Sequence, residues 1–325
     1  MDIKRIYSQL ISKFPDIEIY QNHPLATYTT VKIGGPADIF IHIKSLKDFS
    51  NILKFIYNLK PKIYPTILGN GSNVLIADSG IHSIVIKNDS QEFKILPNNQ
   101  IKVSSGVQLT QLINNSLDHN LVGLEEFVYI PSSIGGAIYG NIHGFDKHDF
   151  NQFLDSIDVF DLNTNEIKHY PTNKISWSYD YSSFQDNPNL IILSTVINLQ
   201  TGDSQAAKVK AQEIIQKKMT FQPMKSLGSV FKNPSESICL PIWNEKKPAG
   251  WIIDNELKLK GHSIGDAQIS PLHANFFVNN GNCTSSDYLS LINLVQSQMQ
   301  TKFNFQFELE IRLLGKFFVN NRNYT

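Results

Sequence analysis

Apolar and polar residues alternate along the first third of the chain in a way that predicts strands separated by a helix. Short apolar runs cover residues 39–43, 64–68, 74–76 and 84–86, and polar or glycine-rich stretches bound them. Between the first two runs, Ser45 can cap a helix whose apolar residues recur at helical spacing, at Phe49, Ile52, Leu53 and Ile56. We therefore expect a β-α-β arrangement over roughly residues 20 to 90. An amphipathic helix should precede it, with an apolar face made of Ile3, Ile6, Leu10 and Ile11.

The rest of the pattern mixes further strands and helices. Residues 101–104 and 191–199 predict strands, whereas the apolar spacing of residues 109–117, 204–218 and 286–299 predicts helices. Near the end of the chain, four apolar residues alternate with charged ones, which indicates a half-buried strand over residues 307–313. The expected fold class is α+β.

Chain length predicts more than one compact part. A chain of 325 residues is longer than a single hydrophobic core usually supports. A polar turn at residues 200–204 offers one boundary. We expect three parts, namely residues 1–90 with the amino-terminal helix, residues 91–203 and residues 204–325, with the last residues returning to the first part.

The composition disfavours functions that depend on a strongly charged or apolar surface. Lysine and arginine together number 29, as do aspartate and glutamate, so no net charge draws the chain to nucleic acid or to an anionic membrane. Cys239 and Cys283 lack the spacing of a metal site or a redox pair, which predicts free thiols in a reducing compartment. No run of about 18 apolar residues is present. We expect a cytoplasmic monomer that binds neither a membrane nor nucleic acid.

Three glycine-rich segments in the first 145 residues are candidates for ligand binding, namely residues 29–38, 68–74 and 130–141. Residues 68–74 offer successive backbone N–H groups without Cβ obstruction, although they lack the third glycine and the following helix of a dinucleotide fingerprint. Each segment alone is also typical of a tight turn, or of glycines that pack a helix against a sheet. Together they predict one ligand cradle. The candidate cofactor-binding residues are Thr30, Ile33, Gly34, Gly35, Gly69, Asn70, Gly71, Ser72, Asn73, Pro131, Ser132, Ser133, Gly135, Gly136 and Asn141.

Other polar residues are candidates for chemistry or for metal binding. Ser229 follows a glycine and precedes Lys232 and Asn233. A serine in this setting can deliver a proton if a charged neighbour assists it, and it can equally bond its own backbone. His143 and His148 lie near aspartates but lack the spacing of metal ligands, so a surface loop without metal is expected there.

In their order and spacing, these segments resemble the UDP-N-acetylenolpyruvoylglucosamine reductase family, the flavoenzymes of peptidoglycan synthesis. The resemblance covers about residues 22 to 315. Its motifs are residues 29–38, 68–73, 123–125, 130–141, 228–234, 261–265 with Ser270, 273–276 and 308–315. Each motif is modest, but their combination is specific.

The resemblance implies a fold and a reaction. The fold would be an FAD-binding module of two subdomains, residues 1–90 and 91–203, of the vanillyl-alcohol-oxidase type, followed by an α+β substrate-binding domain. NADPH would reduce FAD, and a hydride would then pass to C3 of the enolpyruvyl ether of UDP-N-acetylglucosamine. Ser229 would protonate C2, and Glu310 would stabilise the enol, with Glu308 as an alternative one strand repeat away. Lys217 or Lys218, Lys232 and Asn233 would contact the diphosphate of the substrate.

Position 180 departs from the family in a way that bears on the substrate. The family carries an arginine there, in a Tyr-Arg-x-Ser motif that grips the substrate carboxylate, whereas this chain has Asp180. An aspartate repels a carboxylate. Either a lysine or Arg312 replaces this grip, or the chain is a divergent FAD oxidoreductase with another substrate, or it binds FAD without catalysis. Two smaller departures are Ser132 in place of glycine and Leu227 in place of alanine.

Overall fold

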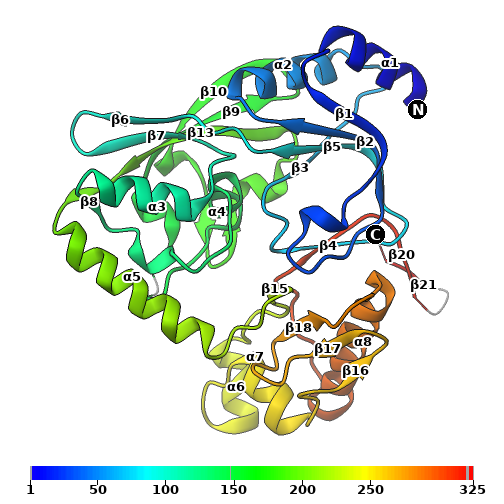
Figure 1. Ribbon diagram of the computed structural model, residues 1–325. Coiled ribbons are helices and arrows are strands. Elements are labelled where there is room, and N and C mark those ends of the chain that lie inside the picture. Colours follow the sequence, from blue (N-terminus) through cyan, green and yellow to red (C-terminus); the bar gives the residue numbers. More distant parts are fainter. Residues whose placement is uncertain (1, 147, 320–321, 325) are drawn as a thin grey trace. The chain divides into compact units, whose positions relative to one another are not determined.

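The computed structural model describes residues 2–146, 148–319 and 322–324, which form two compact units (Figure 1). The first unit contains residues 1–22, 38–70 and 83–218, and the second contains residues 23–37, 71–82 and 219–325. The chain passes between the units after residues 22, 37, 70, 82 and 218, and Phe160, Leu162, Ile191 and Leu193 share one apolar core with apolar residues of segments 6–63 and 84–86. The division into three parts stays a prediction about subdomains.

The first unit opens with a small sheet that is covered by two helices. The helices are α1 (Ile3–Lys13) and α2 (Leu46–Tyr57), and the strands β1 (Glu18–Pro24), β2 (Pro36–Ile43), β5 (Ile81–Asn88) and β3 (Thr66–Leu68) lie in that order. The predicted cap of α2 is confirmed, since the Ser45 side chain accepts a hydrogen bond from the Asp48 N–H at 3.1 Å. The predicted apolar face of α1 is wrong at Ile11, which is 42% exposed because it lies a helical step beyond the buried Leu10.

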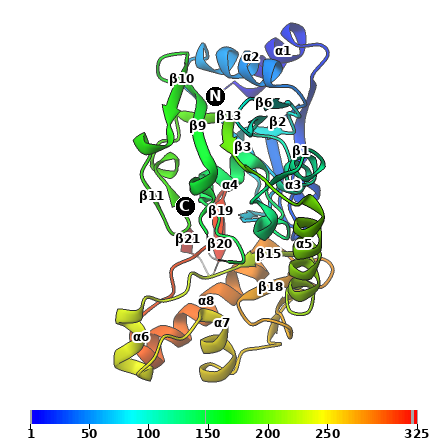
Figure 2. The same ribbon diagram turned by 90° about the vertical axis from the view of Figure 1, so that its left-hand side faces the viewer.

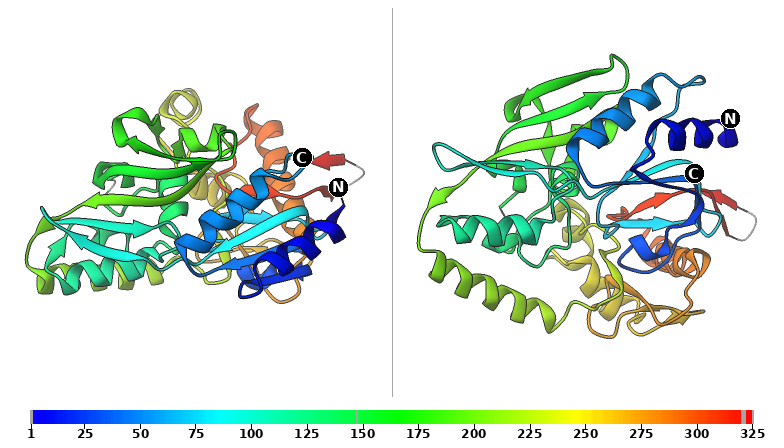
Figure 3. Two further views of the ribbon diagram at one scale, coloured as in Figure 1. Left: turned by 90° about the horizontal axis from the view of Figure 1, so that it is seen from above. Right: turned by 45° about the horizontal axis from the view of Figure 1, so that its top comes forward.

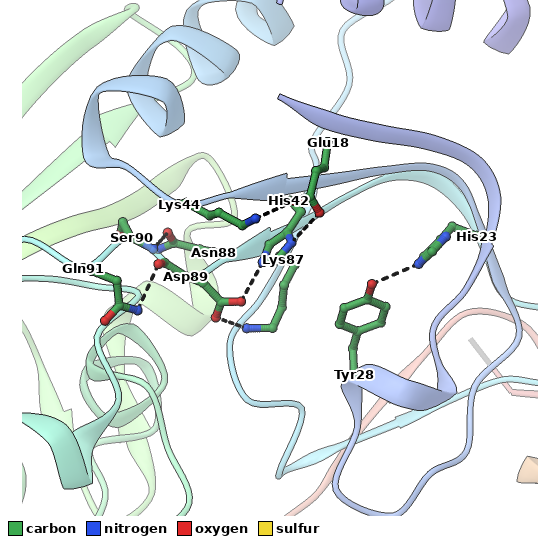
Figure 4. Close-up of polar contacts among 10 residues, drawn as sticks. All are labelled: Glu18, His23, Tyr28, His42, Lys44, Lys87, Asn88, Asp89, Ser90 and Gln91. Carbon is green, nitrogen blue, oxygen red and sulfur yellow. Dashed lines mark hydrogen bonds and ion pairs between the residues drawn. The ribbon is translucent and has the colours of Figure 1, made fainter. Parts of the chain in front are cut away.

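A chain of charged side chains crosses three strands of this sheet (Figure 4). His42 on β2 contacts Glu18 of β1 at 3.0 Å through Nδ1 and Asp89, just after β5, at 2.8 Å through Nε2. Lys44 and Lys87 pair with the same two carboxylates. Both ring nitrogens of His42 thus lie within hydrogen-bond distance of a carboxylate. The network therefore joins the three strands by charge as well as by backbone pairing.

The larger sheet of the first unit is antiparallel (Figure 3). Its order is β10 (Glu166–Pro171), β9 (Leu154–Asp161), β13 (Leu190–Asn198), β7 (Gln100–Ser104) and β6 (Phe93–Leu96). The helices α3 (Leu109–Asp118), α4 (Ile134–Gly140) and α5 (Ser204–Met219) share its apolar core. Two short pairs complete the unit, β11 (Trp177–Ser178) with β12 (Tyr181–Ser182) and β8 (Leu121–Val122) with β14 (Gln200–Thr201). The strands and helices predicted over this stretch are confirmed.

The second unit contains a four-stranded sheet with the order β15 (Ser226–Ser229), β18 (Phe276–Asn279), β17 (Ala267–Ile269) and β16 (Ser263–Ile264) (Figure 1), of which β15 and β18 are also labelled in Figure 2. Helix α8 (Ser285–Phe303) shares its core and begins with a capping box of Thr284 and Asp287. The shorter helices α6 (Glu236–Trp243) and α7 (Ala249–Trp251) precede it, and a π-helical turn at Ile252–Glu256 continues α7. No helix among the described residues has both the length and the apolar character needed to cross a membrane.

The end of the chain corrects one prediction. Strand β19 (Arg312–Leu314) pairs in parallel with β4 (Val74–Ile76), and β20 (Phe317–Val319) pairs with β21 (Arg322–Tyr324). The strand predicted over residues 307–313 is reduced to an isolated bridge at Leu309 and to β19. The reason is a change of partner, because Leu309 pairs with Phe231 and the Arg312 N–H donates to the Asn73 carbonyl at 3.0 Å.

Candidate active site

Ser229 lies at the end of β15 and follows a glycine with an unusual backbone conformation. It is half-buried and pairs with Phe276 of β18. Gly228 before it has φ +78°, a conformation that side chains rarely adopt. Leu227 is 2% exposed and packs in the core of the unit, so the larger side chain that replaces the family alanine is directed into the protein interior.

Asn275 fixes the segment that follows Ser229. Its side-chain Nδ2 donates to the Phe231 carbonyl at 2.8 Å, and its Oδ1 accepts from the Phe231 N–H at 3.0 Å. Its own carbonyl accepts from the Val230 N–H at 2.8 Å. The sequence places Asn275 in a family motif but gives it no role. The available signal is a lone amide within the apolar run from Ala274 to Val278.

The structure separates the two glutamates that the sequence leaves as alternatives. The Glu310 N–H donates to the Val230 carbonyl at 2.9 Å, which places Glu310 opposite the residue that follows Ser229. The Glu310 carbonyl accepts from the Asn73 side chain at 3.2 Å. The Glu308 side chain is 72% exposed and pairs with Lys232. Backbone pairing brings both glutamates to the segment after Ser229, since the Lys232 N–H donates to the Glu308 carbonyl at 2.8 Å. Glu310 pairs nearer to Ser229, and the Glu308 side chain belongs to a surface ion pair.

Asn233 contacts the start of α7, since its Oδ1 accepts from the Ala249 N–H at 2.9 Å. The residue is exposed. Lys232 is partly buried and held by Glu308. Both predicted substrate-binding residues of this segment therefore have fixed side-chain positions within the second unit.

Two glycine-rich segments meet within the second unit. The Thr30 N–H donates to the Gly71 carbonyl at 3.1 Å, and the Thr30 hydroxyl donates to the Ser226 carbonyl at 2.6 Å. Gly71 has φ +60°, and a Cβ there would lie 2.2 Å from the Tyr28 carbonyl oxygen. Only glycine fits at this close approach. Ile33 is 2% exposed, so only its backbone remains for the predicted cofactor contact.

Gly34 and Gly35 continue the first of these segments, and Ser72 and Asn73 continue the second. The Gly35 N–H donates to the Ala77 carbonyl at 3.0 Å, and a Cβ on Gly35 would lie 2.1 Å from the Asp78 carbonyl oxygen. Ser72 is half-buried and Asn73 is exposed. The predicted residues of this unit therefore form one locally packed cluster.

In the first unit, the segment around residue 135 is the start of a helix, which corrects the predicted glycine-rich loop. Ser133 caps α4 by accepting from the Gly136 N–H at 3.2 Å. The Gly135 N–H donates to the Ser105 carbonyl at 2.8 Å, and a Cβ on Gly135 would lie 3.0 Å from the Ser105 Cβ. Gly135 thus packs the helix closely against the end of β7, which is the alternative that the sequence left open.

The neighbours of this helix start are also predicted cofactor residues. A Cβ on Gly69 would lie 2.4 Å from the Ser133 hydroxyl, and Asn70 contacts Gln108 through its side chain. Pro131 and Gly136 are exposed. Ser132 is buried, and its hydroxyl donates to the Ser133 carbonyl at 2.9 Å. Residues 69–70 and 131–136 therefore lie together within the first unit.

Asn141 ends α4 in a left-handed conformation and is buried. Its Nδ2 donates to the Ser178 carbonyl at 2.9 Å, and its Oδ1 accepts from the Asn151 N–H at 3.1 Å. Both ends of the amide contact the protein itself. Its predicted cofactor contact stays a prediction, and its structural role is to join α4 to the segment before β12.

Asp180 lies in the turn between β11 and β12, in the first unit. Its Oδ1 lies 3.1 Å from His143 Nδ1. The His143 ring stacks on Tyr179 with 4.8 Å between the ring centroids. His148, the other histidine of the predicted loop, contacts Glu126 at 2.7 Å. Among the described residues, no group of three or more side chains is arranged to hold a metal ion.

The two lysines at the end of α5 lie over one aromatic ring. Lys217 Nζ is 4.7 Å and Lys218 Nζ is 5.6 Å from the centre of Phe145. Burial lowers the pKa of Lys218 below its usual range, and the charge of Lys217 lowers it further. An anion bound near these lysines would relieve this repulsion.

Comparison with known proteins places the chain in a family. Residues 220–314 match the model of the UDP-N-acetylenolpyruvoylglucosamine reductase C-terminal domain, and residues 37–169 match an FAD binding domain. The UDP-N-acetylenolpyruvoylglucosamine reductase of Listeria welshimeri is 34% identical over 311 residues, which cover 95% of this chain and 99% of the relative. The chain belongs to the UDP-N-acetylenolpyruvoylglucosamine reductase family. The reductase of Carboxydothermus hydrogenoformans is 32% identical over 97% of this chain and all of its own length.

A solved structure of the family agrees in fold. The UDP-N-acetylenolpyruvylglucosamine reductase (MurB) from Thermus caldophilus is 26% identical and superimposes with a TM-score of 0.73, covering 92% of this chain and 99% of that one. The predicted family and the predicted fold class, an α+β FAD-binding module followed by an α+β domain, are confirmed.

Proposed function

We propose that this protein catalyses the FAD-dependent reduction of UDP-N-acetylglucosamine enolpyruvate to UDP-N-acetylmuramate, with NADPH as the reductant. The observation that carries the proposal is the match to reductases of this name over 95% of the chain. The reaction would take place in the cytoplasm and supply a precursor of peptidoglycan, and thereby serve cell shape and division. The proposal includes a monomeric enzyme that acts without membrane or nucleic acid.

The glycine-rich segments fit a cofactor of this kind. Cβ atoms at Gly69 and Gly71 would collide with neighbouring atoms at 2.4 and 2.2 Å, so the chain there has room only for glycine. The first turn of α4 presents the exposed Gly136 beside the exposed Pro131. Backbone free of Cβ atoms suits the approach of a pyrophosphate or a flat ring. We assign the FAD contacts to these segments and to residues 30–35.

Residues 30–35, 69–73 and 131–136 would hold FAD, which when bound would supply the hydride chemistry between NADPH and C3 of the enolpyruvyl group. Negative charge then develops on C2 and on the adjoining carboxylate. In the proposed mechanism the Ser229 hydroxyl donates its proton at C2, and the Glu310 side chain stabilises the enol form. Asn275 keeps Ser229 in place through its hydrogen bonds to the two following residues.

The remaining proposed contacts bind the substrate. Lys232 and Asn233 of the second unit, and Lys217 or Lys218 of the first, would contact the diphosphate, the lysines through their charge and Asn233 through its amide N–H. Lys217 and Lys218 lie over the same ring of Phe145, which brings two ammonium groups together at the end of α5. These assignments depend on the family resemblance together with the local geometry of each segment.

The test follows the oxidation of NADPH by the purified holoenzyme. We expect absorbance at the NADPH maximum to fall only when the enolpyruvyl sugar is present. Glu310→Gln should lower kcat by about 10²- to 10³-fold, the usual effect of removing one group that stabilises the developing charge. Glu308→Gln is the matched control, because it removes only an exposed pair with Lys232, and its kcat should stay close to that of the wild type.

Three outcomes separate the alternatives. Oxidation that depends on the sugar supports the proposal. A flavin that NADPH bleaches, but that the sugar fails to reoxidise under anaerobic conditions, indicates a divergent oxidoreductase with another substrate. A bound flavin that neither NADPH nor NADH reduces indicates a binding protein without catalysis.

A further inference from the structure

The amide of Asn233 is held in one orientation by the backbone of α7. Its Oδ1 accepts from the Ala249 N–H at 2.9 Å. A backbone N–H only donates, so the amide oxygen must face α7 and the amide nitrogen lies on the other side of Cγ. Asn233 is exposed, and its Nδ2 has no hydrogen-bond partner among the described residues. Two N–H donors are therefore available on a side chain whose orientation the protein itself fixes.

Gly250 allows the start of α7 to lie close to the turn that carries His273. It follows Ala249 and is buried. A Cβ at position 250 would lie 2.7 Å from His273 Cε1 and 3.3 Å from His273 Nδ1. Carbon atoms in contact are about 3.5–4.0 Å apart, so any larger residue here displaces either α7 or the His273 ring. Gly250 thus sets how closely the Ala249 N–H approaches its partner.

The His273 ring has little freedom to move away. Its Nδ1 accepts from the Asn275 N–H at 3.2 Å. Its ring centre lies 4.9 Å from that of Phe276 and 6.2 Å from that of Phe221. Asn275 is held in turn by its two hydrogen bonds to Phe231. A side chain at position 250 would therefore displace α7 rather than the histidine.

The contact between Gly250 and His273 joins the two elements that hold the segment of Ser229. Ser229 pairs with Phe276 of β18, and Asn233, four residues later, is held by the start of α7. A Cβ at position 250 would also lie 3.5 Å from the Cβ of the residue before Phe276. All of these residues belong to the second unit. The fit of Gly250 therefore determines where Asn233 lies relative to Ser229.

We propose that Gly250 is a positioning residue for substrate binding. It lets α7 lie against His273, so that the Ala249 N–H holds the amide of Asn233 and the Nδ2–H donors are presented to the diphosphate of the substrate. The role rests on the proposed function, in which Asn233 contacts the diphosphate. An amide released from Ala249 can turn its oxygen toward the phosphates, and an oxygen that only accepts gives them no hydrogen bond.

The test uses UDP as the probe, because it carries the diphosphate and needs no turnover. The FAD-loaded protein is titrated with UDP by calorimetry, and KM and kcat are measured with the enolpyruvyl sugar. Gly250→Ala should raise the Kd of UDP by about tenfold or more, the effect of losing one hydrogen bond to a charged group. The KM of the enolpyruvyl sugar should rise similarly and kcat should change less, since Ser229 is held by β18.

A second substitution separates positioning from general damage to the fold. Asn233→Asp keeps an oxygen for the Ala249 N–H but replaces the two N–H donors by a negative charge, so it should weaken UDP at least as much as Gly250→Ala. The double variant Gly250→Ala with Asn233→Asp should bind UDP no more weakly than Asn233→Asp alone, because both changes remove the same contact.

A rescue variant tests the steric contact itself. His273→Asn removes the Cε1 atom and retains an oxygen that can accept from the N–H two residues later. Gly250→Ala combined with His273→Asn should bind UDP within about twofold of His273→Asn alone. Gly281→Ala is the matched control, since this exposed glycine of the same unit would bring its Cβ only to 3.3 Å from Asp266 Oδ2. It should bind UDP as the wild type does.

Each contrary result has a distinct meaning. If Gly250→Ala binds UDP as the wild type does, the inference is wrong even when turnover confirms the proposed function. If the losses from Gly250→Ala and Asn233→Asp add, Gly250 acts on the structure at large and the inference is again wrong. If Gly250→Ala folds only together with His273→Asn, the inference stands when Asn233→Asp weakens UDP and fails when it does not.

The wild type separates this inference from the proposed function. The expected pattern with UDP, together with no reduction of the enolpyruvyl sugar, contradicts the proposed function alone. A wild type that reduces the sugar but does not bind UDP contradicts the inference alone. A wild type that binds neither UDP nor the sugar contradicts both.

Discussion

Replacing Asn275 by alanine tests how the residues beside Ser229 are held. The side chain is 3% exposed and makes two hydrogen bonds to Phe231, one with its N–H at 3.0 Å and one with its carbonyl at 2.8 Å. Phe231 is fully buried, so water cannot replace these contacts without opening the core. Leaving a buried polar group without a partner costs about 1–3 kcal/mol, and two such groups are left here. We expect Asn275→Ala to lower the free energy of unfolding of the second unit by about 2–6 kcal/mol.

Urea unfolding followed by tryptophan fluorescence measures this effect, because Trp243 and Trp251 lie in the second unit and only Trp177 lies in the first. Asn280→Ala is the matched control. Asn280 is exposed and its side chain donates to Gln268 at 3.2 Å, so its removal should change stability by less than about 0.5 kcal/mol.

The same variant should also lower kcat in the reductase assay, since the backbone of Val230 and Phe231 sets the position of Ser229. Unfolding curves of Asn275→Ala that coincide with those of Asn280→Ala would refute the reasoning, because the two buried hydrogen bonds would then contribute nothing measurable. A large loss of stability with unchanged kcat would limit the role of Asn275 to the fold.

Three further predictions concern the glycines, the acid range and the thiols. Gly135→Ala should reduce the flavin bound per protein, measured by visible absorbance, because the new Cβ would press on Ser105 at 3.0 Å. Burial raises the pKa of Asp161, but hydrogen bonds, first among them that of Lys168 at 2.6 Å, hold it below its usual value. This stabilisation is present above the unfolded pKa of about 4 and is lost as the pH falls through the folded value, so the urea midpoints of wild type and Asp161→Asn should converge in acid. Burial, followed by nearby aspartates, raises the pKa of Cys283 to about 12, so the native protein should react with a thiol reagent at pH 8 only slowly, and the unfolded protein rapidly.

Each of these has an internal comparison. Gly140→Ala should retain flavin, since its nearest neighbour would be Ile142 at 3.8 Å, and equal loss in both variants would contradict the steric argument. Asp155→Asn changes an exposed residue and should follow the wild type at every pH. Cys239 is fully buried, and Cys283 is 7% exposed, so neither thiol should react rapidly in the native protein. Rapid labelling of either cysteine before unfolding would contradict the prediction.

The sequence by itself determined the elements whose signals are local. The helix capped by Ser45, the strands at residues 101–104 and 191–199 and the helix of residues 286–299 follow from apolar spacing and capping residues within a few turns of chain. The family was also accessible, because motifs in a fixed order identify a fold even where each motif is ambiguous. Apolar spacing, capping residues and motif order can be read without knowing which distant segments pack against each element.

The tertiary structure decided what depends on distant partners. Leu309 pairs with Phe231 and Arg312 with Asn73, so the alternating pattern of residues 307–313 does not become one strand. Strand alternation puts Glu308 and Glu310 on one face, and only the folded chain shows that the Glu308 side chain pairs with Lys232 while the Glu310 N–H donates to the Val230 carbonyl.

Asp180 is the clearest case. In the sequence, Asp180 is noticed only because it stands where the family carries an arginine. In the folded chain its carboxylate contacts His143, which lies 37 residues away in the sequence. The physical reason is that the groups around a charged side chain determine how strongly it is hydrated and which partners it can bind. Burial and hydrogen bonding set what a carboxylate can do, and the sequence fixes those neighbours only through the fold.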